Sequence, residues 1–166
     1  MAFRRGGSTK SMVVLRADRS GRYSHVGIVV ATDSGFRIVH VTPGEREPGA
    51  GADTVKLERL DEFFASHRAD HGEIARFTKD GDAAHKAAKN ALRFFRDRII
   101  FDHDYDLADT AKMYCTELVW RAYGLAGIDL TQERRSVISG LGPFNGEHIL
   151  PSDIYDYPAI KCVFSF

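Results

Sequence analysis

Two runs of β-branched residues near the N-terminus constrain the fold of this chain most strongly. Residues 23–44 read YSHVGIVVATDSGFRIVHVTPG, and only Asp33, Ser34 and Gly35 separate the two runs. Runs rich in Val and Ile that are joined by a short turn of Asp, Ser and Gly are typical of a β-hairpin. We therefore expect both runs to lie in the central sheet of the protein.

Further strands and helices are expected on either side of this hairpin. Strands are predicted at residues 11–16, 54–60, 72–77 and 159–166, and helices at 61–67, at 82–98 and from 115 onward. Together these elements indicate an α+β fold in which helices pack against a sheet.

The length of the chain favours one domain. A chain of 166 residues that is 43% hydrophobic can build one compact core and leaves little room for a second. The first residues, MAFRRGGSTK, are polar and rich in glycine. We therefore expect residues 1–11 to form a flexible tail and residues 12–166 to form a single domain.

Charge and composition exclude several classes of partner. Lys plus Arg and Asp plus Glu both number 23, so no strong net field recruits nucleic acid or an anionic membrane. No apolar run has the length of a transmembrane helix or of a signal peptide. We expect no integral membrane segment and a cytoplasmic location after synthesis, so that any delivery outside the cell would require a secretion system or a phage. The oligomeric state stays open.

The position of Cys115 points to thiol chemistry. Cys115 begins the amphipathic helix predicted in AKMYCTELVWRAYG, residues 111–124, and a helix N-terminus favours a thiolate. The second cysteine, Cys162, lies in the apolar alternation IKCVFSF and is expected to be a small buried hydrophobe. Two cysteines are too few for a disulfide scaffold, which favours a reducing compartment.

His25 and His40 interrupt the two apolar strands of the hairpin and are candidates for the base and its orienting partner. If the hairpin turn contains two residues, Gly27 lies opposite His40, and His25 is the diagonal neighbour of His40 on one face. A neutral His40 then accepts a hydrogen bond from the His25 ring, and Glu45 is the alternative orienting residue. A shift of one residue would turn His40 to the other face, and each histidine also has the alternative of a purely structural role in the core.

Patterns for other chemistry are incomplete. Asp102, Asp104 and Asp106 resemble the start of a calcium loop, but the turn glycine and the final glutamate of such a loop are missing. His67 and His71 lie four residues apart without a third ligand motif. The chain also lacks a phosphate-binding loop and a serine-nucleophile motif. We therefore expect no metal and no cofactor.

Three segments together resemble a known family of enzymes. YSHVGIVV, RIVHVTPG and FDHDYDLADTAKMYCTELVWRAY are similar to the circularly permuted branch of the NlpC-type, papain-like superfamily, and in particular to the YiiX/YebB-like hydrolases. The resemblance implies a small antiparallel sheet packed against helices, with a cysteine nucleophile at a helix N-terminus, a base on one strand and a polar orienting group on the next. Cys115, His25 and His40 match these places, while Tyr114 and Thr116 are candidates for the substrate or oxyanion site.

The expected function is therefore that of a cysteine hydrolase. A peptidoglycan-type peptide, cleaved at an amide bond, is the first choice of substrate, and the alternative is hydrolysis or transfer of an ester or acyl-lipid group. A different class of function stays open, in which the domain binds a peptide or acylated ligand without any chemistry.

Overall fold

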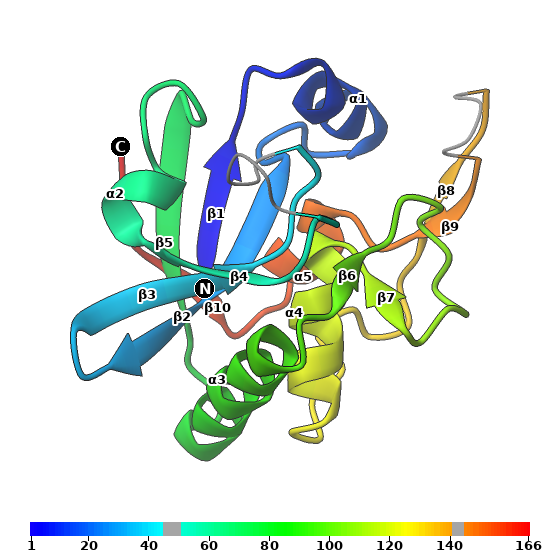
Figure 1. Ribbon diagram of the computed structural model, residues 1–166. Helices are drawn as coiled ribbons and strands as arrows, with labels where there is room; N and C mark the ends of the chain where they lie inside the picture. Colours follow the sequence, from blue (N-terminus) through cyan, green and yellow to red (C-terminus); the bar gives the residue numbers. More distant parts are fainter. Residues whose placement is uncertain (45–50, 141–144) are drawn as a thin grey trace.

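The computed structural model describes residues 1–44, 51–140 and 145–166 (Figure 1). The strands are β1 (Ala2–Arg5), β2 (His25–Thr32), β3 (Gly35–His40), β4 (Lys56–Arg59), β5 (His71–Phe77), β6 (Ile100–Phe101), β7 (Lys112–Met113), β8 (Ser136–Ile138), β9 (Gly146–His148) and β10 (Ile160–Ser165). The helices are α1 (Thr9–Ala17), α2 (Leu60–Phe63), α3 (Gly81–Arg96), α4 (Cys115–Gly124) and α5 (Pro151–Tyr155).

A six-stranded antiparallel sheet forms the centre of the protein. Its strands follow the order β10-β5-β1-β2-β3-β4. Two small sheets lie beside it, of which β6 and β7 pair in parallel and β8 and β9 pair antiparallel. This mixed architecture, with a mostly antiparallel sheet and packed helices, agrees with the predicted α+β class.

The predicted hairpin is confirmed as β2 and β3. The register pairs Ile28 with Val39 and Thr32 with Gly35, which leaves a two-residue turn between the strands. Gly35 has a φ of 100°, a conformation that glycine adopts without steric cost. Continued toward the other end of the hairpin, the same register places Gly27 opposite His40, as predicted.

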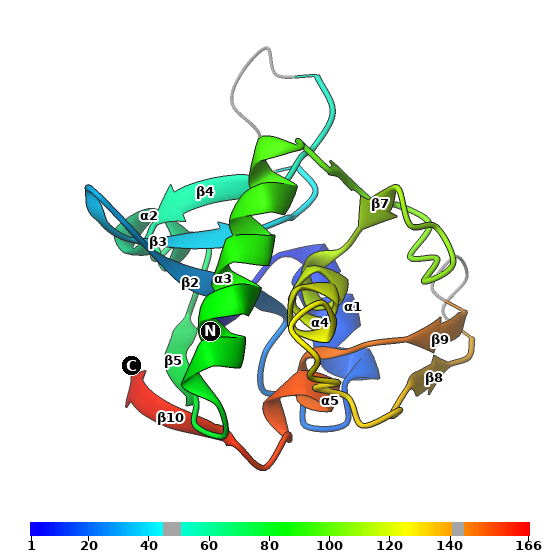
Figure 2. The ribbon, with the colours of Figure 1, turned by 90° about the horizontal axis from the view of Figure 1, so that it is seen from below.

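Helices α3 and α4 lie side by side and cover one face of the sheet (Figures 1 and 2). In α3, the N-cap residue Asp80 accepts hydrogen bonds from the first turn, and a stripe of alanines that includes Ala87 and Ala91 is buried. In α4, Leu118 and Val119 are completely buried in the same core. This packing places the N-terminus of α4 against β2.

The flexible tail predicted at residues 1–11 is wrong. The segment Ala2–Arg5 forms β1 and lies between β5 and β2 in the middle of the sheet, where Ala2 and Phe3 are completely buried. The backbone groups of β1 pair with strands on both sides, which stabilises a segment whose local sequence carries no strand pattern.

The strand predicted at residues 11–16 is also wrong, because this segment lies within α1. Ser8 caps the helix by accepting a hydrogen bond from the Ser11 N–H at 3.1 Å, and this cap outweighs the β-propensity of Val13 and Val14.

Among the helices that the structure describes, none combines the length and the apolar character that a membrane span requires.

Candidate functional site

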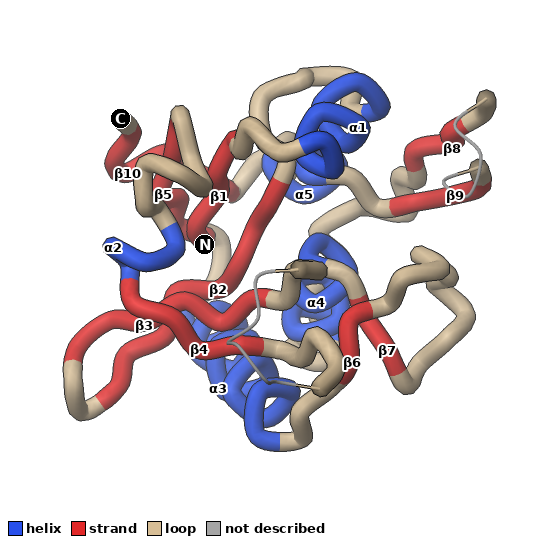
Figure 3. The backbone as a smooth tube through the Cα atoms, turned by 45° about the horizontal axis from the view of Figure 1, so that its top comes forward, coloured by secondary structure: helices blue, strands red, loops and turns tan. Residues whose placement is uncertain are grey.

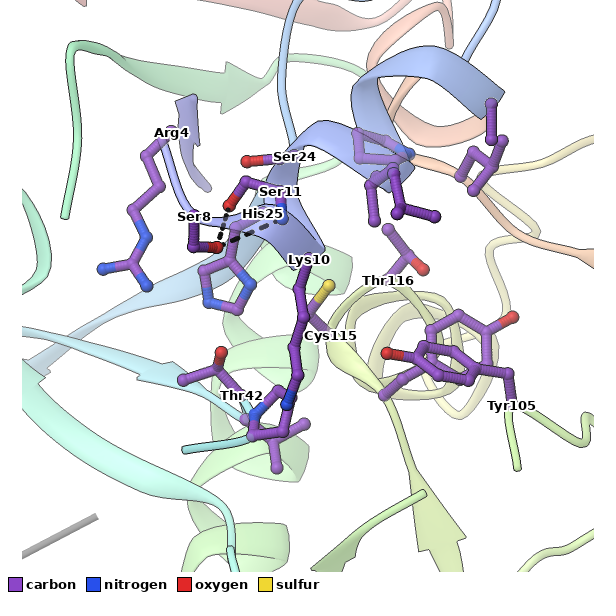
Figure 4. Close-up of a pocket in the computed structure, with 18 of the residues that line it drawn as sticks. Arg4, Ser8, Lys10, Ser11, Ser24, His25, Thr42, Tyr105, Cys115 and Thr116 are labelled. Carbon is purple, nitrogen blue, oxygen red and sulfur yellow. Dashed lines mark hydrogen bonds between the residues drawn. The ribbon is translucent and has the colours of Figure 1, made fainter. Parts of the chain in front are cut away.

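A cavity of about 670 Å³ contains the two residues that the sequence singles out most strongly. Both Cys115 and His25 line it. Its other walls come from α1, from the segment that follows β3 and from the connection between β9 and α5. Figure 3 shows how the backbone of these segments is arranged, and Figure 4 shows lining side chains. The cavity therefore lies where the N-terminus of α4 meets β2.

The N-terminus of α4 positions Cys115. Tyr114 is the N-cap residue, and its N–H donates to Glu117 Oε2 at 3.3 Å. The Glu117 carboxylate is completely buried and forms an ion pair with Arg121. Glu117 thus holds the first turn of the helix. Burial raises the pKa of its carboxyl to about 7, and the charge of Arg121 offsets part of this effect.

Burial decides the protonation state of the Cys115 thiol. It raises the pKa of this thiol to about 11, and the hydrogen bonds of the Val26 and Thr116 N–H groups, which favour the thiolate, offset only part of the effect. The N–H groups at the helix N-terminus thus favour the thiolate, as expected, but burial outweighs them in the protein without substrate. Cys162, expected to be buried, is exposed on β10.

His25, His40 and Glu58 form a continuous chain of hydrogen bonds. His25 Nε2 lies 2.9 Å from His40 Nδ1, and His40 Nε2 lies 2.9 Å from Glu58 Oε2. Because the carboxylate can only accept, His40 Nε2 donates to Glu58, and His40 Nδ1 accepts from the His25 Nε2–H. In this arrangement, Nδ1 of His25 carries no hydrogen and keeps a lone pair that can accept a proton.

The pKa values of His25 and Glu58, at the two ends of this hydrogen-bonded chain, are both lowered, but for different reasons. Burial, followed by the charge of Arg4, lowers the pKa of His25 well below its usual value. Burial would raise the pKa of Glu58, but the hydrogen bond to His40 and the charges of His40 and Arg68 lower it to about 2. Glu58 is therefore ionised and His25 neutral at neutral pH, so His25 can accept a proton.

The hydroxyls of Tyr114 and Thr116 are bound to the segment between β9 and α5. The Tyr114 hydroxyl accepts from the Ile149 N–H at 3.0 Å, and Thr116 Oγ1 donates to the Ile149 carbonyl at 2.5 Å. Both residues line the cavity, and both hold its wall in place. Glu45 lies outside the described residues.

Sequence reasoning missed Glu58 as the third member of the chain. In the antiparallel pairing of β3 with β4, Glu58 lies opposite Ile38 and Lys56 lies opposite His40. Glu58 is thus a diagonal neighbour of His40, the same relation that joins His25 to His40. The available signal was the polar alternation of KLER in the strand that follows the hairpin.

The other candidates do not form a metal site in the described residues. Asp102 accepts hydrogen bonds from the N–H groups of Asp104 and Asp106, which forms a local turn. His67 lines the cavity, whereas His71 stacks on Tyr23, with 5.7 Å between the ring centroids. Within the part of the chain that the structure describes, no group of three or more His, Cys, Asp or Glu side chains is placed to hold a metal ion.

Comparison with known proteins identifies the fold. No family model and no curated protein matches this sequence. Among solved structures, the crystal structure of the metalloprotein YiiX from Escherichia coli O157:H7 (DUF1105) is similar, with a TM-score of 0.75 and 20% sequence identity over 98% of this chain and 93% of that one. At this identity the likeness concerns the path of the backbone. The chain has a YiiX-like fold.

Proposed function

We propose that the protein is a cysteine hydrolase with Cys115 as nucleophile and His25 as base. Nδ1 of His25 takes the thiol proton while Sγ attacks the substrate carbonyl carbon. His25 then gives this proton to the leaving group as the bond from the carbonyl carbon breaks. In the second half of the reaction, His25 accepts a proton from water, and the hydroxide oxygen attacks the acyl carbon. The bond from this carbon to Sγ then breaks, the acid is released, and His25 returns the proton to the sulfur.

The hydrogen bond between His25 and His40, beside a cavity that also contains Cys115, carries this proposal. A binding pocket needs neither a thiol nor an oriented imidazole. In our proposal, His40 and Glu58 are positioning residues that fix the tautomer of His25 and stabilise its protonated form during the reaction. The main-chain N–H of Cys115, at the N-terminus of α4, is the proposed donor to the oxyanion.

The order of these groups along the chain supports placement in the permuted, NlpC-type branch of the papain-like superfamily. The histidine strand precedes the cysteine helix, as in that branch, and the backbone has a YiiX-like path. YiiX is described as a metalloprotein, and our proposal for this chain does not depend on a metal ion, because the proposed nucleophile and base are the side chains of Cys115 and His25.

Two classes of substrate fit the proposed reaction. A peptidoglycan-type peptide cleaved at an amide bond is the class that the family resemblance favours. An ester or acyl-lipid bond is the second class, and the apolar residues of the cavity, among them Val13, Val14 and Leu150, favour it.

The test is turnover of a substrate panel by the full chain. Purified peptidoglycan and a series of acyl esters are incubated with the protein, with Cys115→Ala and with Cys162→Ala, and the products are identified by mass spectrometry. We expect turnover of at least one class, a loss of about 10³-fold or more in Cys115→Ala, and unchanged turnover in Cys162→Ala. Ligand binding without turnover in any protein would instead indicate a binding module.

A further inference from the structure

Helix α1 spans the length of the cavity. Just before it, the Gly6 N–H donates to Ser24 Oγ at 3.0 Å, next to the start of β2. At its other end, the side chain of Asp18 accepts from the Ser152 N–H at 2.8 Å, in the first turn of α5. One end of α1 is therefore fixed beside His25, and the other is fixed beside α5.

Cationic groups line the end of the cavity beside His25. Arg4, Lys10 and Arg68 belong to its lining, and none of the described lining residues is acidic. Lys10 has no ion pair with any described residue, whereas Arg68 binds the Glu58 carboxylate. Figure 4 shows the Lys10 side chain extending from α1 past Cys115 in the direction of Thr42. This end of the cavity thus offers positive charge to a ligand.

The end of the cavity beside α5 is mainly apolar, although His148, next to Ile149, also belongs to the lining. Val13, Val14 and Ala17 line it from α1, and Ile149 and Leu150 line it from the segment that leads into α5. The main-chain groups of Ile149 are already bound to the hydroxyls of Tyr114 and Thr116, so mainly hydrocarbon remains to face a ligand. A hydrocarbon chain bound here would be removed from water, and the main-chain groups of Ile149 would keep their hydrogen bonds.

The reacting groups lie between these two ends. His25 pairs with Arg4 in the register of β1 and β2, whereas Thr116, the residue after Cys115, binds Ile149. In Figure 4, Arg4 and Ser8 lie on one side of the Cys115 sulfur, and Thr116 and Tyr105 lie on the other. Because a general acid must reach the leaving group, the leaving group belongs on the His25 side of the sulfur and the acyl group on the other side.

We propose that the site cleaves compounds in which an apolar acyl chain is joined by an ester or amide bond to an anionic leaving group. The acyl chain lies against Val13, Val14 and Leu150, and the negative charge of the leaving group lies near Lys10. This inference rests on the proposed hydrolase function and assigns its substrate class. It favours an acylated anionic compound over an uncharged one.

Matched synthetic esters test this inference. The octanoyl ester of para-hydroxybenzoate carries an anionic leaving group, and the octanoyl ester of para-hydroxybenzamide is its neutral counterpart. The corresponding acetyl esters of both phenols lack the long hydrocarbon chain. The kcat/KM values are measured for the protein, Lys10→Gln, Val14→Thr and Lys161→Gln, in which an exposed lysine of β10 is the matched control. Differences in the intrinsic reactivity of the esters cancel when the ratio of two kcat/KM values is compared between variants.

We expect the protein to prefer the anionic octanoyl ester. Lys10→Gln should lower the ratio of anionic to neutral turnover by about two- to fivefold, as for an exposed charge pair, and raised salt should have the same effect. Val14→Thr should lower the ratio of octanoyl to acetyl turnover by about fivefold, because the ligand chain then buries a hydroxyl. Lys161→Gln should leave both ratios unchanged.

Binding separates a failure of the substrate class from a failure of the hydrolase. Para-octyloxybenzoate and para-octyloxybenzamide, which have an ether in place of the ester, are titrated into Cys115→Ala with and without Lys10→Gln. Turnover of the esters without preference for the anion or the chain would overturn the substrate class and leave the hydrolase standing. Tighter binding of the benzoate that depends on Lys10, with no turnover of any ester, would support the ligand class and overturn the hydrolase.

Discussion

At the scale of single residues, burial gives Cys115 and His25 a neutral resting state. It raises the pKa of the thiol to about 11 and lowers the pKa of the imidazole well below its usual value. Both shifts disfavour a thiolate–imidazolium pair in the protein without substrate. Proton transfer to His25 would then accompany the attack on the carbonyl instead of preceding it.

The alkylation of Cys115 should therefore depend on pH in a particular way. Because the thiolate is the reactive form and its pKa is raised, the rate with iodoacetamide should be low at neutral pH and should rise steadily toward pH 11. Mass spectrometry of the modified peptides measures this rate, and the exposed Cys162 is an internal control for the reagent. A plateau of fast labelling near pH 6 would show that the protein holds a preformed ion pair.

Glu58 should act on turnover through His40. Glu58→Gln keeps an oxygen that can accept from His40 but removes the charge that stabilises a protonated His25–His40 pair. We expect kcat to fall by about tenfold with little change in KM, as is typical when a residue that orients the catalytic histidine is replaced. The acidic limb of the pH–rate profile should move to lower pH. Loss of the Glu58 charge destabilises protonated His25 and so lowers the pKa below which His25 can no longer accept the thiol proton.

Steady-state kinetics across pH measures both effects. Glu133→Gln, which changes an exposed glutamate outside the cavity lining, is the control and should behave like the unchanged protein. An equal loss in both variants, or a change in KM alone, would contradict a positioning role for Glu58.

At the scale of elements, the close approach of β2 and β3 at Gly27 maintains the pair of histidines. A Cβ atom at this position would lie 2.6 Å from Ile38 Cγ2, 2.8 Å from the Val39 carbonyl oxygen and 3.0 Å from His40 Cβ. Such distances require the strands to move apart. A glycine at position 27 is thus tied directly to the position of His40.

Gly27→Ala should therefore reduce both stability and turnover. We expect the free energy of unfolding to fall by about 1–3 kcal/mol, as for overpacking of a close contact. Urea denaturation measures this change, and turnover of the best substrate reports on the histidines. In the control Gly124→Ala, at the end of α4, a Cβ meets no atom within 4 Å. Equal stability of the two variants would contradict the close approach.

At the scale of the whole molecule, β1 joins the two halves of the main sheet. It pairs with β5 on one side and with β2 on the other, and β2 carries His25. The Phe3 side chain is completely buried in the main core. The segment 2–5 thus connects the sheet edge that ends in β10 to the strands that carry the site.

Phe3→Ala should consequently destabilise the whole protein. Removing a completely buried phenylalanine costs about 3–5 kcal/mol, which is a large part of the stability of an ordinary domain. Phe36→Ala on β3, where the side chain is 65% exposed, should change the free energy of unfolding by less than about 0.5 kcal/mol. Chemical denaturation measures both variants, and a small loss in Phe3→Ala would indicate that the N-terminal segment is dispensable.

The sequence by itself determined the elements whose local pattern and tertiary environment agree. The β-branched runs around Asp33 and Ser34 form the predicted hairpin, and Cys115 begins the predicted helix. The relation of His25 to His40 followed from the sequence only for a two-residue turn, because alternation along paired strands fixes which side chains share a face, and the structure decided that register.

Only the tertiary structure decided the features that depend on distant partners. The segment 2–5 became a central strand because β5 and β2 satisfy its backbone, and Glu58 joined His40 because β4 pairs with β3. The protonation of Cys115 and His25 depends on burial, which arises when α4 packs against β2 and α1 covers the cavity. Local sequence specifies backbone preference and side-chain chemistry, whereas desolvation and long-range pairing exist only once the chain is folded.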